Sequence, residues 1–315
     1  MKSKRYKFAV AGLNTRSGTI TFDKLIEALQ LLGEGSQKAL RLAIEGTSSK
    51  VGPLPKWVQA SSEFVFRGIK RGSTILEFEA PPLGETAREQ IRQDGLWYSK
   101  PESEDTAISV LSQAVSAIKN GELESEKYDK AMLDTLLQFE QLLQQKTSIV
   151  KLIDIQNGTT MFAIDGDVLL KMQKISASFP APQPMVISGE LDMMEKSTRK
   201  FKLRISDGHV VSGRVSEGSV GLQELKSMWG TKVTVRGTMH FTANGKPRLL
   251  EADLFRSYEE GDLLFEQIKI TGDLKTQVHV ARERVRNGNI VSEIWGKWPG
   301  DESIEELLEL IKDKA

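Results

Sequence analysis

The fold of the C-terminal half of the chain is decided by residues 201–215, FKLRISDGHVVSGRV. Apolar and polar residues alternate on both sides of a turn at 206–208, which is the pattern of two half-buried strands joined by a tight turn. The alternation places Phe201 on one face with Leu203 and Ile205, so these side chains are expected in a core. The stretch therefore predicts a β-hairpin with one apolar face and one basic face.

Three further strands accompany this hairpin. Residues 186–192 precede it, and residues 233–241 and 250–254 follow it, with a short helical pattern at 222–229 between the third and fourth strands. Five strands with a helix in that place resemble an OB-fold barrel, of the kind that also occurs in uncharacterised bacterial proteins. We therefore expect an OB-like β-barrel over residues 185–257. Three glycines lie inside its strands, where a small barrel needs close backbone approach: Gly189, Gly213 and Gly237.

The resemblance to OB-folds implies one candidate ligand for the barrel. OB-folds often bind single-stranded nucleic acid with a basic groove and aromatic stacking platforms on the second and third strands. Phe201 faces the core, so the outward face of these strands has charge but no aromatic platform. Nucleic-acid binding is therefore the alternative to a scaffold or protein-contact role. Its candidate residues are Lys200, Lys202, Arg204 and Arg214.

A proline-rich stretch at residues 179–184, FPAPQP, separates the barrel from the chain before it. Three prolines in five residues do not continue a helix or a central strand, and they favour an extended, semi-rigid connection. We therefore predict four segments. They are an N-terminal domain at 1–178, a linker at 179–184, the barrel at 185–257 and a C-terminal tail at 258–315.

The N-terminal domain is predicted to be α+β, with a mixed sheet and an αα-hairpin. A helix is expected to begin after Thr21 and to end near Gly33. Two amphipathic helices form the hairpin, at 108–118 and 128–143, and they pack on the sheet or pair with a second copy of the chain. Strand patterns occur at 7–11, 40–44, 64–66 and 75–78. Three more, at 149–155, 161–164 and 169–172, complete this sheet or form a small separate one.

The C-terminal tail has the features of a linear binding element. Arg282, Arg284 and Arg286 recur at spacing two, which puts three guanidinium groups on one side of an extended chain. The motif Trp295-Gly-Lys-Trp298 follows, and then an acidic amphipathic helix. This helix either docks on its own domain or enters a groove of another protein. The predicted partner-binding residues are Arg282, Arg284, Arg286, Trp295, Lys297, Trp298, Ile304, Leu307, Leu308 and Ile311.

The tryptophan motif and the acidic helix resemble the neutralising tails of antitoxins that pair with PIN-domain ribonuclease toxins. The resemblance implies that Trp295 and Trp298 anchor the tail on the toxin. It also implies that Lys297, or one of the three arginines, reaches the acidic metal-binding site of the toxin. The chain is several times longer than such antitoxins and does not begin with their short DNA-binding element.

Composition excludes several classes of protein. The 315 residues contain 43 Lys+Arg and 43 Asp+Glu, so the chain is not a polyelectrolyte, and without cysteine it forms no disulfide and has no thiolate nucleophile. No apolar run is long enough to span a membrane. Phosphate loops, nucleophile elbows and metal-ligand spacings are also missing, so no catalytic residue, metal or cofactor is expected. The sequence thus predicts a cytoplasmic, non-enzymatic, antitoxin-like regulator that binds a protein partner, and leaves homo-oligomerisation open.

Overall fold

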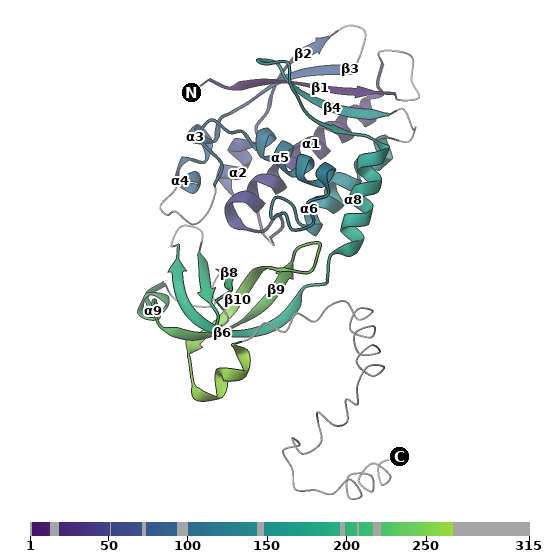
Figure 1. The fold of residues 1–315 in the computed structure, drawn as a ribbon. Coiled ribbons are helices and arrows are strands. Elements are labelled where there is room, and N and C mark those ends of the chain that lie inside the picture. Colours follow the sequence, from purple (N-terminus) through teal and green to yellow (C-terminus); the bar gives the residue numbers. More distant parts are fainter. Residues whose placement is uncertain are drawn as a thin grey trace, which may run out of the picture. The chain divides into compact units, whose positions relative to one another are not determined.

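The computed structural model describes residues 2–12, 19–50, 52–70, 74–92, 100–143, 148–195, 199–206, 208–216 and 222–266. Within them the chain is α+β, as predicted (Figure 1). It holds two hydrophobic cores. One core lies between an antiparallel sheet and a group of helices, and the other fills a closed barrel.

The first sheet has the strand order β2-β3-β1-β4-β5. The central strand β1 buries Tyr6, Phe8 and Val10 on the side of the helices, because alternate residues of a strand point to the same face. Strands β4 and β5 join this sheet, so the prediction that they complete it is confirmed. The bounds of the strands are β1 Lys4–Ala11, β2 Val65–Lys70, β3 Thr74–Ala80, β4 Ile149–Asp154 and β5 Thr160–Ile164.

The helices of the first core gather around α1, which packs against α2, α5, α6 and α7. The two predicted amphipathic helices are present, the second of them divided into α6 and α7. The bounds are α1 Phe22–Glu45, α2 Lys56–Ser61, α3 Leu83–Thr86, α4 Arg88–Ile91, α5 Ala107–Asn120, α6 Lys130–Leu137, α7 Phe139–Leu142 and α8 Gly166–Ser178.

The strand predicted at residues 40–44 is wrong, because α1 continues through it and ends at Gly46. The second half of this helix is buried on most of its sides, so its apolar residues do not form a single stripe. In the sequence they alternate with polar residues, as they would in a half-buried strand. Gly33 does not end the helix, and Gly35 lies inside it where Leu136 approaches closely. The helix therefore passes through two glycines.

The strand predicted at residues 169–172 is also wrong, because this stretch belongs to α8. The side chain of Asp165 accepts a hydrogen bond from the backbone nitrogen of Val168 and so caps the helix. Leu169 and Met172, three residues apart, are buried together on one helical face. A short apolar run of this kind fits a helix as well as a strand, and the capping residue Asp165 is the local signal that favours a helix.

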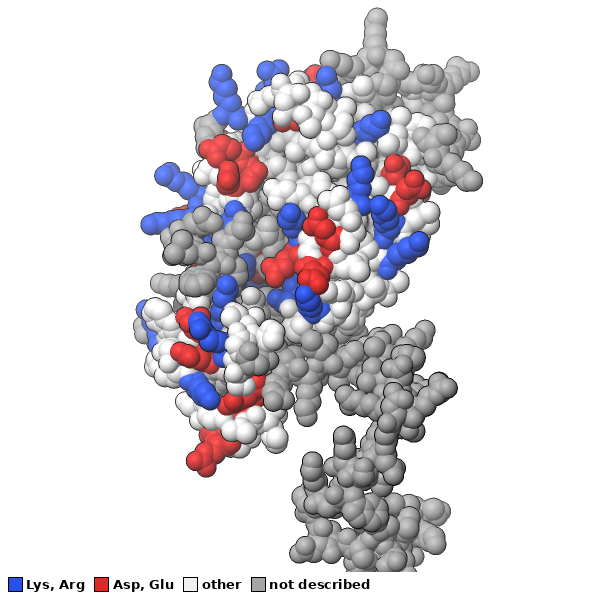
Figure 2. Space-filling model, viewed as in Figure 1, with Lys and Arg blue, Asp and Glu red and all other residues white. Residues whose placement is uncertain are grey.

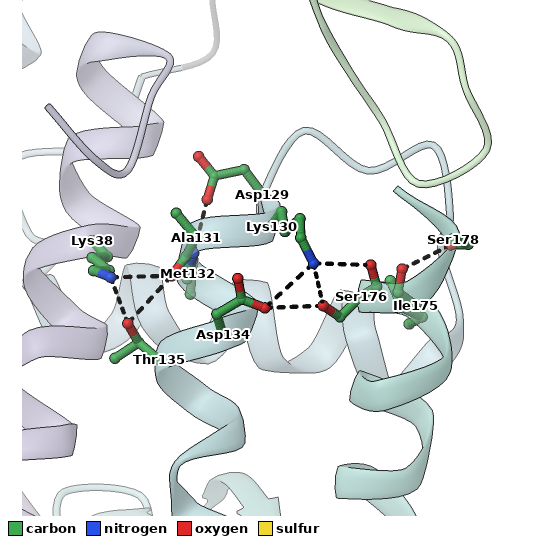
Figure 3. A network of polar contacts seen from close by, with 10 residues as sticks. All are labelled: Lys38, Asp129, Lys130, Ala131, Met132, Asp134, Thr135, Ile175, Ser176 and Ser178. Atoms are coloured by element: carbon green, nitrogen blue, oxygen red, sulfur yellow. Dashed lines mark hydrogen bonds and ion pairs between the residues drawn. The ribbon is translucent and has the colours of Figure 1, made fainter. Parts of the chain in front are cut away.

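Polar contacts join α1, α6 and α8 (Figure 3). Lys38 of α1 donates from Nζ to the carbonyl of Ala131 at 3.1 Å and to Oγ1 of Thr135 at 2.5 Å. On the other side of α6, Asp134 accepts from Oγ of Ser176 in α8 at 3.0 Å. The three helices are therefore fixed to one another by polar side-chain contacts as well as by the apolar core.

The second core fills a closed five-stranded barrel with the order β10-β8-β7-β6-β9. Strands β8 and β10 are parallel, the other neighbours are antiparallel, and α9 lies between β8 and β9 in the chain, all of which is compatible with an OB-like fold. Phe201, Leu203 and Ile205 are buried, as their alternation predicted. The bounds are β6 Gln183–Met194, β7 Lys200–Arg204, β8 Val210–Val215, α9 Leu222–Ser227, β9 Lys232–Phe241 and β10 Pro247–Ser257.

The first residues of the predicted tail are fixed to the barrel. A short 3-10 helix, Glu260–Phe265, follows β10, and its Asp262 is buried. This carboxylate pairs with Arg256 and accepts from Oγ1 of Thr234 at 2.7 Å. In the part of the chain that the structure describes, no helix is both long and apolar enough to cross a bilayer.

The strand glycines yield a test of the barrel. A Cβ atom on Gly237 would overlap the backbone carbonyl of Glu251, which is held in the facing strand β10. We expect Gly237→Ala to lower the free energy of unfolding by about 1–3 kcal/mol, the usual cost of overpacking. Gly33→Ala is the matched control, because nothing lies within 4 Å of its new Cβ and alanine favours a helix. Equal stability of the two variants in urea denaturation would contradict the barrel packing.

Candidate functional site

A cleft of about 680 Å³ lies where the C-terminal half of α1 meets the barrel. Residues of α1, α5 and the barrel strands form its walls, together with the loop at 100–105. Its lining mixes apolar and charged side chains, as small-molecule sites commonly do. The lining consists of Ala39, Leu42, Ala43, Gly46, Lys100, Pro101, Glu102, Asp105, Val110, Gln113, Ser125, Glu126, Lys127, Lys200, Ser212, Gly213, Arg248 and Leu249.

Arg248 of β10 holds the barrel against the end of α1. Its Nη1 donates to the carbonyl of Gly46 at 2.7 Å, and its Nη2 lies 3.8 Å from Oδ2 of Asp129. A cation at the C-terminal end of a helix is favourable, because the last carbonyl groups carry partial negative charge. The side chain is buried, with 8% of the residue exposed, and its Nε has no hydrogen-bond acceptor. Burial lowers the pKa of Arg248, although the charge of Asp129 opposes this shift.

The carboxylate of Asp129 is also held by hydrogen bonds from residues other than Arg248. Asp129 caps α6 by accepting from the backbone nitrogen of Met132 at 3.0 Å, a contact drawn in Figure 3. It also accepts from the nitrogen of Ser48 at 3.0 Å and from its Oγ at 2.5 Å. Three donors therefore share the negative charge that faces the guanidinium of Arg248.

Lys200 at the start of β7 is another buried cation of the cleft, with 6% of the residue exposed. Its Cε would lie 3.5 Å from a Cβ placed on Gly46, so the side chain runs along the end of α1. Burial lowers the pKa of Lys200 to about 8. The charges of Lys100 and Arg214 act in the same direction, while those of Glu195 and Glu126 oppose it.

Three ion pairs involve residues that line the cleft or lie next to its lining. Lys100 binds Oε1 of Glu195 at 2.5 Å. Glu45, in the last turn of α1, accepts from both Arg214 of β8 and Arg41, each at 3.2 Å. These acidic groups are therefore already paired with cations.

The candidate nucleic-acid residues of the barrel are divided by this arrangement. Lys200 and Arg214 are cross-strand partners, and both lie against the helices. Lys202 is partly buried, and Arg204 is exposed with its Nη2 2.8 Å from Oδ2 of Asp192. Arg204 and Arg214 are thus paired with carboxylates of the same chain, and Lys200 is buried beside the end of α1. No pattern in the sequence pointed to Arg248, Asp129 or Lys100, because their roles depend on partners far away in the chain.

All the predicted partner-binding residues lie outside the described residues, which end at Glu266. Within the described ranges, no group of three or more His, Asp or Glu side chains is arranged to hold a metal ion. His240 of β9 is partly buried and lies with its Nε2 3.2 Å from Oε2 of Glu251.

No protein-family model matches this sequence, and a search of curated proteins finds no significant match.

Replacing Arg248 tests whether the barrel depends on the end of α1. We expect Arg248→Met to lower the free energy of unfolding by about 2–4 kcal/mol, because it leaves the Gly46 carbonyl and the Asp129 carboxylate without their cation. Arg236→Met in β9 is the matched control, since that arginine pairs with Asp253 on the exposed surface and should contribute little. A similar loss in both variants, measured by urea denaturation, would argue against a special role of Arg248.

Lys200 should make stability depend on pH. Its pKa is about 8 in the folded chain and 10.5 ordinarily, so between these values the unfolded chain binds more protons. Stability should therefore rise with pH in that window, by up to about 3 kcal/mol. We expect the free energy of unfolding to rise from pH 7 to pH 9.5 more steeply in the natural chain and in Lys202→Met than in Lys200→Met. Burial raises the pKa of Tyr6 and Tyr128 from 10.0 to about 12, so these groups affect stability mainly above the measured pH range. Equal pH slopes in all three proteins would refute the assignment.

Proposed function

We propose that this chain is a non-enzymatic regulatory protein, antitoxin-like, whose C-terminal tail binds and restrains a protein partner. The observation that carries the proposal is the orientation of the barrel. Its basic strands β7 and β8 are turned partly toward the helices of the same chain, where Lys200 and Arg214 are engaged. The barrel then serves as a scaffold, and the tail binds the protein partner.

Electrostatics favour the scaffold role over nucleic-acid binding. A protein that binds a phosphate backbone needs several accessible cations along one track. Of the four candidates, Arg204 is exposed but paired with Asp192, and Lys202 is partly buried. Figure 2 shows Lys and Arg mixed with Asp and Glu over the visible face of the molecule. The charged side chains on this face therefore form no continuous basic patch. Single-stranded nucleic-acid binding through Lys202 and Arg204 remains the alternative.

The tail supplies the chemistry of a partner-binding element. Tryptophan is the side chain that most often dominates a protein interface, and Trp295 and Trp298 lie within four residues of each other. Lys297 between them, and the arginines at 282, 284 and 286, are suited to an acidic surface. An acidic metal site of a PIN-type ribonuclease toxin is the partner surface that the antitoxin resemblance suggests.

The tail should bind the product of a neighbouring gene through its tryptophans. On co-expression of the full chain with that protein, we expect Trp295→Ala/Trp298→Ala to reduce the co-purified partner at least about tenfold, the loss expected of one or two hot spots. Trp229→Ala is the matched control, because Trp229 is an exposed barrel tryptophan whose Nε1 donates to the carbonyl of Asp192. Partner retention by the double variant, or equal loss in the control, would overturn the proposal.

A further inference from the structure

We propose that the N-terminal half of α1 is a docking surface for an amphipathic helix of another protein, one whose apolar face is flanked by lysine or arginine. This surface belongs to the N-terminal domain, so the inference goes beyond the proposed function of the tail and does not rest on it. Three features carry it: an exposed apolar row on α1, a glycine with free space in front of it, and an acidic row beside them.

The apolar row lies on the solvent side of α1. Phe22, Ile26 and Leu29 are 74%, 39% and 41% exposed. Their spacing of four and then three residues puts them on one face of the helix, and it is the spacing with which helices pair in coiled coils. Single exposed apolar residues are ordinary, but three in register over about two turns indicate an interaction surface.

The same face of α1 is buried further along the helix. Leu40 lies about five turns after Phe22 and Ile44 follows one turn later, and both are buried. Helix α2 packs against α1, and Gln37 of α1 donates from Nε2 to Oγ of Ser62, at the end of α2, at 3.0 Å. The face is thus covered in the second half of α1 and open in the first. A partner helix would extend a helix packing that the chain already has.

Gly33 completes the open row one turn after Leu29. Glycine destabilises the interior of a helix relative to alanine. Gly35 has a packing reason, because a Cβ atom there would lie 3.2 Å from Cδ2 of Leu136. In contrast, nothing in the described part of the chain lies within 4 Å of a Cβ atom placed on Gly33. A helix that approached α1 closely at this turn would use that space.

A second row, one residue after the first at each position, indicates the charge of the partner. It carries three acids and no cation, and it consists of Asp23, Glu27, Gln30 and Glu34. Glu27 is partly buried and the other three are exposed. Residues that flank the apolar seam of a helix pair select the partner by charge. A basic flank on the partner is therefore favoured, whereas two copies of α1 packed antiparallel would bring like charges together.

Fluorescence anisotropy with a labelled synthetic peptide tests the proposal. The probe has leucine at positions a and d of a heptad repeat and lysine at e and g, and a second peptide has glutamate in place of lysine. We expect the full chain to bind the lysine peptide saturably, with a Kd in roughly the micromolar range, and the glutamate peptide at least about tenfold more weakly.

Substitutions in the apolar row should remove this binding. We expect Phe22→Ser/Ile26→Ser to weaken the lysine peptide about tenfold or more, the loss expected of one hot spot. Gly33→Leu should weaken it similarly, because leucine fills the space in front of the glycine. Leu170→Ser is the matched control, since Leu170 is also an exposed leucine but lies on α8.

A charge reversal separates docking at this surface from general attraction of a basic peptide. Glu27→Lys/Glu34→Lys should make the chain prefer the glutamate peptide to the lysine peptide, because the flanking row then carries the opposite charge. All the substituted side chains are exposed or partly exposed, so each variant should melt as the natural chain does, which thermal melting checks.

Several outcomes would overturn the proposal. They are absence of saturable binding of the lysine peptide, retention of binding by Phe22→Ser/Ile26→Ser or Gly33→Leu, equal weakening in Leu170→Ser, and unchanged preference in Glu27→Lys/Glu34→Lys. A dimer of the natural chain in sedimentation that Gly33→Leu dissociates would also overturn it, and would assign the surface to a second copy. None of these outcomes depends on the tail tryptophans.

Discussion

The contact between Arg248 and the C-terminal end of α1 is the interaction on which the arrangement of the helices and the barrel depends. The carbonyl of Gly46 needs a donor because the helix ends there, and the guanidinium supplies one at 2.7 Å. Asp129, which caps the start of α6, adds the opposing charge. One arginine thus joins the end of α1, the start of α6 and the barrel strand β10.

This contact changes the role of the barrel surface. Strands β7 and β8 carry the basic face that an OB-like barrel commonly offers to a ligand, yet here part of that face forms the wall of an internal cleft. Arg214 finds its partner in Glu45 of α1 rather than in a phosphate. The packing that pairs Arg214 with Glu45 thus removes that cation from a nucleic-acid track.

Local patterns predicted much of the fold but little of the cleft. Alternation placed Phe201 and its neighbours in the barrel core, because that pattern depends only on the strand itself. It misled at residues 40–44, where tertiary packing buries α1 on most sides and leaves no single apolar stripe. The cleft could not be predicted at all, since Arg248 and Gly46 are 202 residues apart in the chain and nothing local indicates that they meet.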